Sequence, residues 1–223
     1  MMARARGAAG SGAVMLCRLA VVLVCWLAGP TAVHSQAVPG VLMPAGDYGH
    51  ALAAALQLAP DEIDYAALRS VYAADPGFTG RSRLTDRTAE EFLNRESAEP
   101  SIAWTEDDVM RAIFVDFPLL DTQIAAYGHY KTAPLPQENR DRMMGFHSAF
   151  YRGIRDSILA SERQTDGVRT FVVLSVREEY EILGSLELTS TQQSLLNIEG
   201  VYFDRHETAT GPILFDITPF FGK

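Results

Sequence analysis

Hydrophobic residues recur every three or four positions through most of the chain after residue 46, a spacing typical of amphipathic helices. In the longest such segment, apolar side chains return at every fourth residue, as expected for a helix with one face in a core. The pattern predicts a helix from Asp47 to the residue before Pro60, one capped by Asp61, one opened by a capping box at 105–108, and two more over 119–130 and 137–160. Between them, residues 77–100 are polar and predict a loop around one short helix at 87–94.

The pattern changes after Gly167, where β-branched and apolar residues gather in short runs. The run 170–175 predicts a buried strand, and the acidic segment 177–186 that follows predicts a short helix. Segments 201–208 and 213–218 flank turn residues and predict a β-hairpin. Helices first and strands last indicate an α+β fold, with a helical N-terminal two-thirds packed on a small, mostly antiparallel C-terminal sheet.

The first 35 residues have the order of a secretory signal peptide. Three arginines come first, an apolar run follows at 19–28, and small residues come after Gly29 and Pro30. The apolar run is about half of the roughly 20 residues that a membrane-spanning helix needs. We expect cleavage before Gln36 or before Val38, then a flexible lead-in to residue 46 and a single domain over 47–223. The protein is thus expected in the periplasm or the external medium of a bacterium.

Composition narrows the possible partners. The net charge is −9, and loss of the three signal arginines makes it −12. An acidic surface disfavours nucleic acid or an anionic membrane as the main partner, and no later run predicts membrane insertion after cleavage. Both cysteines, Cys17 and Cys25, lie in the signal, so the mature chain has no disulfide and no thiolate chemistry.

The chain has no phosphate loop, no Gly-x-Ser-x-Gly and no His-Glu-x-x-His, and it predicts no cofactor. Its best polar cluster is on the expected hairpin, where Asp204 and His206 are two residues apart and share one face. With a three-residue loop, Asp216 lies opposite Asp204, and the three groups could bind a divalent cation or share a proton. With a two-residue loop, Arg205 faces Asp216 in an ordinary ion pair. The sequence leaves both registers open.

Glu178 and Glu179 form a second candidate pair, directly after the buried strand at 170–175. The end of a strand is a favoured place for binding groups, yet acids in the first turn of a helix also stabilise its dipole. On a helix the two side chains point in different directions, so they are not a ready acid/base pair. His129, near a helix end, and His147, beside the apolar stripe, are expected to be structural.

Short motifs spread over most of the mature chain resemble a family of exported bacterial proteins, the domain-of-unknown-function family 4919. They include Phe171 to Leu183, the closing Gly211 to Ile217, and Asp64-Tyr65 with Asp75-Pro76 upstream. Where a typical member has Ser-Gly-Asp-Gly, this chain has Glu162 to Gly167. The resemblance implies an exported α+β protein and no particular activity.

These observations favour an exported soluble protein that binds or interacts within the cell envelope, with an envelope protein or a small ligand as its partner, over an enzyme. The alternative is a metal-dependent or acid/base hydrolase that uses Asp204, His206 and Asp216, with Glu178 or Glu179 nearby.

Overall fold

The structure is a computed structural model that describes residues 44–85 and 105–221. The expected signal peptide, nearly all of the lead-in, both cysteines and the expected helix at 87–94 lie outside the described residues. The helices are α2 (Gly46–Ala55), α3 (Tyr65–Ala74), α5 (Glu106–Val115), α6 (Leu120–Thr132), α7 (Gln137–Ala160) and α8 (Val176–Ser185). The strands are β1 (Arg163–Thr165), β2 (Val168–Val172), β3 (Gln192–Ile198), β4 (Val201–Thr208) and β5 (Gly211–Asp216), followed by the 3₁₀ helix η1 (Thr218–Phe220).

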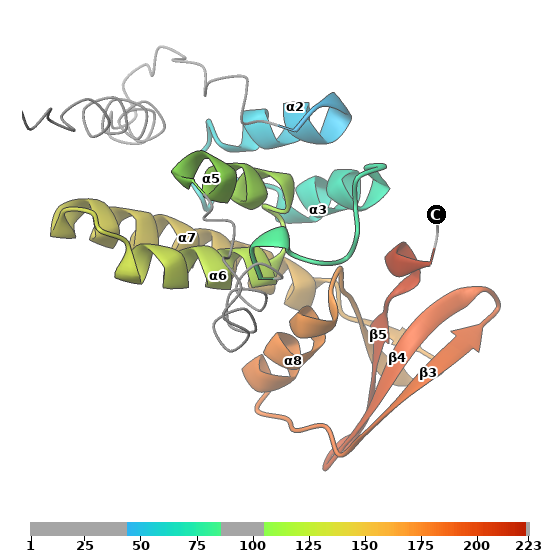
Figure 1. Ribbon diagram of the computed structural model, residues 1–223. Coiled ribbons are helices and arrows are strands. Elements are labelled where there is room, and N and C mark those ends of the chain that lie inside the picture. The colour runs from blue at the N-terminus through green and yellow to red at the C-terminus, as the bar shows by residue number, and fades with distance from the viewer. Residues whose placement is uncertain (1–43, 86–104, 222–223) are drawn as a thin grey trace, which may run out of the picture. The chain divides into compact units, whose positions relative to one another are not determined.

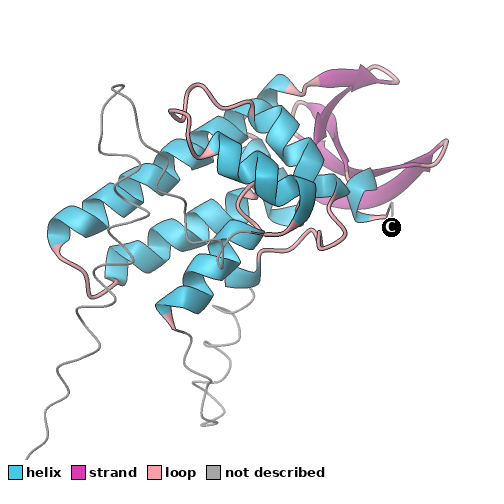
Figure 2. Cartoon of the chain, turned by 90° about the horizontal axis from the view of Figure 1, so that it is seen from above, coloured by secondary structure: helices cyan, strands magenta, loops and turns pink. Residues whose placement is uncertain are grey.

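The predicted α+β class is confirmed. Five of the described helices precede the first strand, and helices and strands occupy separate parts of the domain in Figures 1 and 2. The described strands form one sheet in the order β1-β2-β5-β4-β3. β2 and β5 are parallel, while the other three neighbouring pairs are antiparallel, so the sheet is mixed but mostly antiparallel. Within the described residues, no helix is both long and apolar enough to cross a bilayer.

Local sequence explains where the helices begin. The predicted capping box is present: the Thr105 hydroxyl accepts from the Asp108 backbone N–H, and the Asp108 carboxylate accepts from the Thr105 backbone N–H. The predicted cap at Asp61 is wrong. Asp61 lies in a turn over residues 60–62, and Asp64 caps α3 by accepting from the Ala67 N–H at 2.9 Å.

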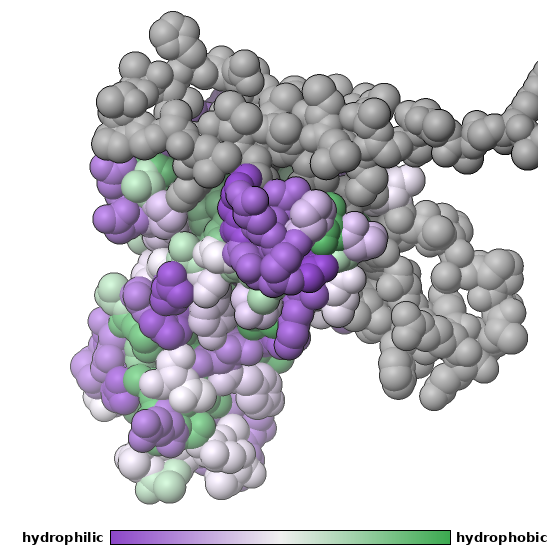
Figure 3. Space-filling view, turned by 90° about the vertical axis from the view of Figure 1, so that its left-hand side faces the viewer, coloured by the Kyte–Doolittle hydropathy of each residue, from purple (hydrophilic) through white to green (hydrophobic). Residues whose placement is uncertain are grey.

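The helical core forms along α7. Phe150, Ile154 and Ile158 of the predicted stripe are buried, and the rings of Phe117 and Phe150 meet edge to face at 4.7 Å between centroids. α7 is polar at its start, and Figure 3 shows a dense hydrophilic group where the connection between α6 and α7 faces the viewer. The apolar stripe therefore belongs to the buried side of this helix.

One glycine of α7 sets how closely α3 can approach. A Cβ built on Gly153 would lie only 2.1 Å from Cε2 of the Tyr65 ring, whereas a Cβ built on Gly145 in the same helix meets nothing within 4 Å. We expect Gly153→Ala to lower the free energy of unfolding by about 1–3 kcal/mol, because the added methyl must displace a buried ring. Gly145→Ala, the matched control, should raise it by about 0.5–1 kcal/mol through helix propensity. Urea unfolding measures both, and equal effects of the two substitutions would contradict this packing.

Candidate functional site

The candidate site lies between α8 and the sheet, and the first turn of α8 positions its main residue. Ser175 caps the helix by accepting from the Glu178 backbone N–H at 3.3 Å. Glu178 and Glu179 follow in the first turn and are both fully buried. Because neighbouring residues of a helix point about 100° apart, the two carboxylates reach different surroundings.

The Glu178 side chain points to the helical layer, and both of its carboxylate oxygens accept hydrogen bonds. Two of these come from Nη1 and Nη2 of Arg69, at 2.8 and 2.9 Å, in a buried ion pair. The backbone N–H groups of Leu120 and Leu174 donate to the same carboxylate at 3.2 and 2.7 Å. This arrangement ties α3, the start of α6 and the β2–α8 connection together. Glu178 is therefore a structural anchor in this fold rather than part of the candidate site.

Glu179 points to the sheet and meets one of the hairpin residues predicted as candidates. Its Oε2 lies 2.7 Å from Nε2 of His206, and neither side chain is exposed to solvent. On the other side of the imidazole, Nδ1 lies 2.9 Å from the Ser190 hydroxyl. The rings of Tyr180 and Phe215 contact the His206 ring edge to face, with centroids 5.5 and 5.3 Å away. His206 is thus fixed in position by polar and aromatic contacts.

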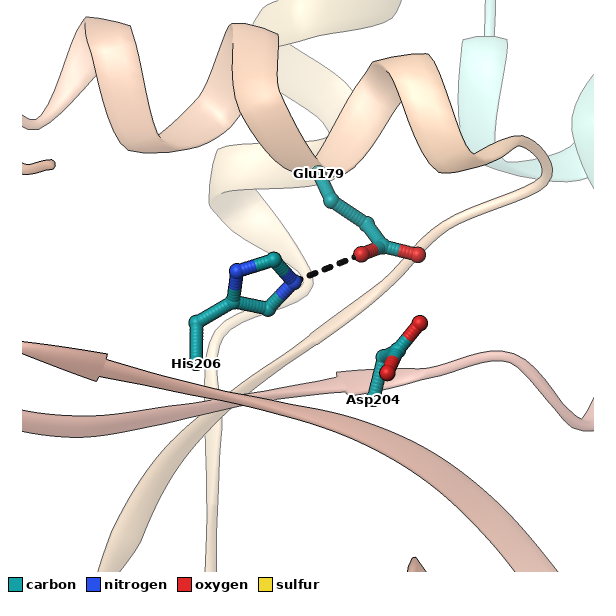
Figure 4. A group of neighbouring side chains, drawn as sticks. All are labelled: Glu179, Asp204 and His206. Carbon is teal, nitrogen blue, oxygen red and sulfur yellow. Dashed lines mark hydrogen bonds and ion pairs between the residues drawn. The ribbon is translucent and has the colours of Figure 1, made fainter. Parts of the chain in front are cut away.

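Asp204 completes the cluster from the neighbouring position on the same face of β4. Each of Glu179, Asp204 and His206 offers one ligand atom, a carboxylate oxygen or an imidazole nitrogen, and these three atoms lie within 4.8 Å of one another (Figure 4). A short chain of hydrogen bonds holds Asp204: Gln193 Nε2 donates to its carboxylate at 2.7 Å, and the Tyr180 hydroxyl donates to Gln193 Oε1 at 3.0 Å. Asp204 is partly exposed, so solvent reaches the cluster from its side.

Asp216 lies outside the cluster, and both predicted hairpin registers are wrong. The loop has two residues, 209 and 210, because Thr208 pairs with Gly211. This register places Phe203 opposite Asp216 and Leu214 opposite Arg205. Since alternate residues of a strand face opposite sides, Asp216 is on the face away from His206. It forms an ion pair with Arg163 at 2.5 Å.

Burial decides the charge of the Glu179–His206 pair. Burial, followed by the nearby carboxylates of Asp204 and Glu178, raises the pKa of Glu179 to about 8. Burial also lowers the pKa of His206, although Asp204 acts in the opposite direction. Both shifts favour a neutral pair at pH 7, in which protonated Glu179 Oε2 donates to Nε2 of His206. The Nδ1–H of that tautomer donates to Ser190.

One atom of the cluster is unsatisfied. Glu179 Oε1 is buried and has no hydrogen-bond partner among the described residues. Figure 4 shows this oxygen on the side of the carboxylate that faces Asp204. A buried carboxylate oxygen without a partner carries a desolvation cost of about 1–3 kcal/mol, and a bound group at this position would remove that cost.

The three groups fit a divalent transition metal. Carboxylate oxygen and imidazole nitrogen bind such ions at about 2.0–2.2 Å, which places neighbouring ligand atoms about 3.4 Å apart in a tetrahedral site. The cluster spans separations of up to 4.8 Å, and partly exposed Asp204 has room to adjust. The imidazole disfavours magnesium and calcium, which prefer oxygen ligands alone.

The other described histidines do not take part. His147 is a buried core residue whose Nδ1 lies 2.8 Å from Gln123 Oε1, and burial lowers its pKa to about 3. His129 is in the last turn of α6, as predicted, and His50 is exposed on α2. Ser190, Gln193 and Tyr180, which surround the cluster, were not among the predicted site residues. The strand that contains Gln193 was not predicted, so no signal placed these side chains beside His206.

No family model matches the chain, and no curated protein or solved structure matches it either. The function is therefore inferred from the geometry of the site.

The anchor at Glu178 predicts a large effect from one substitution. Arg69→Met leaves the Glu178 carboxylate buried without its counter-ion, and we expect the free energy of unfolding to fall by about 3–5 kcal/mol. Arg163→Met is the matched control, because it breaks a partly exposed ion pair and should cost about 1 kcal/mol or less. Denaturant unfolding at pH 7 compares the two. If Arg69→Met lowers the free energy of unfolding no more than Arg163→Met does, Glu178 is not a structural anchor.

Asp121, a second buried acid near Glu178, predicts that the stability of the fold depends on pH. The Asp121 carboxylate accepts from the Ser175 hydroxyl at 2.7 Å, and burial raises the pKa of Asp121 to about 6. A pKa raised by folding means that the native state binds the proton more tightly, so stability falls as pH rises from about 4 through 6.

Asp121→Asn removes this titration while keeping an acceptor for Ser175. We expect the variant to gain stability relative to the wild type between pH 4 and pH 7, by up to about 3 kcal/mol. Unfolding free energies at pH 4, 5, 6 and 7 give the difference. If the unfolding free energies of the variant and the wild type change with pH in the same way, Asp121 does not titrate as described.

Proposed function

We propose that this chain is an exported binding protein that holds a divalent transition metal ion, such as zinc or manganese, at Glu179, Asp204 and His206. The observation that carries the proposal is the buried Glu179 oxygen that faces Asp204 without a hydrogen-bond partner among the described residues. It is the atom that a cation between the two carboxylates would satisfy.

The surroundings support the proposal in two ways. Metal-binding histidines usually have their second ring nitrogen fixed by a hydrogen bond, and Ser190 is in this position on His206. Metal-binding carboxylates are fixed in the same manner, and Gln193 does so for Asp204. The cation would take the place of the proton that Glu179 and His206 share, and it would enter from the partly exposed side of Asp204.

Export is part of the proposal and is supported by the charged, apolar and small-residue order of the first 35 residues. The resemblance to the exported family 4919 also agrees with export but assigns no activity. A hydrolase that uses the same cluster is a second candidate. Three protein ligands leave a position for a water molecule, which a transition metal would make more acidic.

Isothermal titration tests the proposal directly. The full chain, expressed with its own leader and freed of metal by a chelator, is titrated with zinc, manganese and magnesium. We expect one zinc or manganese ion per chain, a higher melting temperature with the ion, and no comparable response to magnesium. Absence of zinc and manganese binding to a folded chain would overturn the proposal.

Matched variants locate the ion. Glu179→Gln keeps the size of the side chain and its hydrogen bond to His206, and Asp204→Asn keeps the acceptor for Gln193. Each should weaken zinc binding by about 100-fold or more, because each removes a charged ligand. Asp216→Asn, on the opposite face of the sheet, should bind like the wild type. Unchanged binding in Glu179→Gln would exclude the cluster as the metal site.

A further inference from the structure

The two outer strands of the sheet differ in how well their free edges are protected. β1 has three residues, and its Arg163 forms an ion pair with Asp216. β3 has seven residues, Gln192–Ile198, and contains no charged residue and no proline. Natural proteins protect exposed edges by shortening them or by placing charges or proline on them, because an open edge pairs with other strands. β1 has such protection and β3 does not.

β3 is also accessible. It is the last strand of the sheet, and no described segment pairs with its outer edge. Figure 1 shows it on the outside of the long hairpin that it forms with β4. Five of its seven residues are exposed, and Leu195 in its centre is 57 % exposed. A long, uncharged edge with an exposed leucine at its centre favours pairing with another strand.

We propose that β3 pairs with β3 of a second copy of this chain, in antiparallel orientation across a two-fold axis. Charge selects this partner. The chain has a net charge of −9, so most surfaces of two copies repel each other, whereas β3 brings no charge to the contact. An isologous contact needs a self-complementary patch. An uncharged strand that pairs antiparallel with itself fulfils this requirement.

In the register centred on Leu195, the pairing does not bring the nearest acidic residue, Glu199, beside another acidic side chain. It places Leu195 opposite Leu195 of the second copy and Gln192 opposite Ile198. Glu199, directly after β3, then lies beside Thr191 of the second copy rather than beside another carboxylate. The two leucines meet on the same face, which adds an apolar cross-strand contact to the backbone hydrogen bonds.

The size of the contact sets the expected affinity. One seven-residue edge buries less than the roughly 1,600 Å² of a standard stable interface, so we expect a reversible dimer with a dissociation constant in the micromolar range. The proposed metal ligands lie on α8 and β4, but β3 is their neighbour: Leu195 is the cross-strand partner of Asp204, and Gln193 donates to the Asp204 carboxylate. Dimerisation is therefore measured in chelator, so that a failure of the dimer is distinguished from a failure of the metal site. The dimer itself goes beyond the proposed function.

Sedimentation equilibrium of the full chain, expressed with its leader and kept in chelator, tests the dimer. We expect the average mass to rise from monomer towards dimer between about 1 and 300 µM. Leu195→Lys should weaken dimerisation at least tenfold, because two lysines would then face each other. Leu58→Lys replaces another exposed leucine, 43 % exposed and outside the sheet, and should leave dimerisation unchanged.

Hydrogen exchange of the wild type identifies the edge without any substitution. Amides in 192–198 should exchange more slowly at high than at low protein concentration, while those of β1 should not change. Ser194→Lys provides a second edge variant if Leu195→Lys does not fold. A monomer over the whole range, equal dimerisation in the edge variants, or protection elsewhere than β3 would overturn the proposal.

Discussion

A buried ion pair between Arg69 and Glu178 joins parts of the fold that are far apart in sequence. Arg69 comes from α3, and its guanidinium also donates to the Pro118 carbonyl at 3.0 Å, just before α6. Glu178 comes from the first turn of α8 and accepts backbone N–H groups from both Leu120 and Leu174. The helical layer and the strand-to-helix connection are thereby held at one point. A buried charge of this kind is tolerated only where its hydrogen bonds are satisfied, and those of Glu178 are.

The position of Glu179 depends on this anchor. With Glu178 held towards the helices, the next residue along α8 must point towards the sheet, where it meets His206. The two adjacent carboxylates therefore have opposite roles. Glu178 has all its partners within the fold, whereas Glu179 has one oxygen on His206 and one without a partner among the described residues. Glu178, whose hydrogen bonds are all made within the fold, is therefore structural, whereas Glu179, which has an oxygen without a partner, belongs to the candidate site.

Local chemistry made much of the fold predictable from the sequence. The strand expected at 201–208 has these bounds in β4, and the capping box at Thr105 opens α5 as expected. The hairpin register was not predictable, because a loop shift of one residue moves Asp216 to the other face of the sheet. β3 escaped prediction because its residues do not alternate between apolar and polar. The turn after it also places Glu199, a non-glycine residue, at positive φ.

The candidate site was only half predictable, for a related reason. Asp204 and His206 share a strand, so their proximity follows from the sequence alone. Glu179 reaches His206 across the contact between a helix and a sheet, 27 residues away, and only tertiary packing brings them together. The sequence therefore identified the right residue types without deciding between Glu178 and Glu179.

The proposed function requires one metal ion bound between α8 and β4. Anomalous diffraction at the zinc absorption edge, from crystals of the protein grown with zinc, locates such an ion. We expect a peak about 2.0–2.2 Å from a Glu179 oxygen, an Asp204 oxygen and an imidazole nitrogen of His206. A peak only at the exposed His50, or no peak within the cluster, would rule out this metal site.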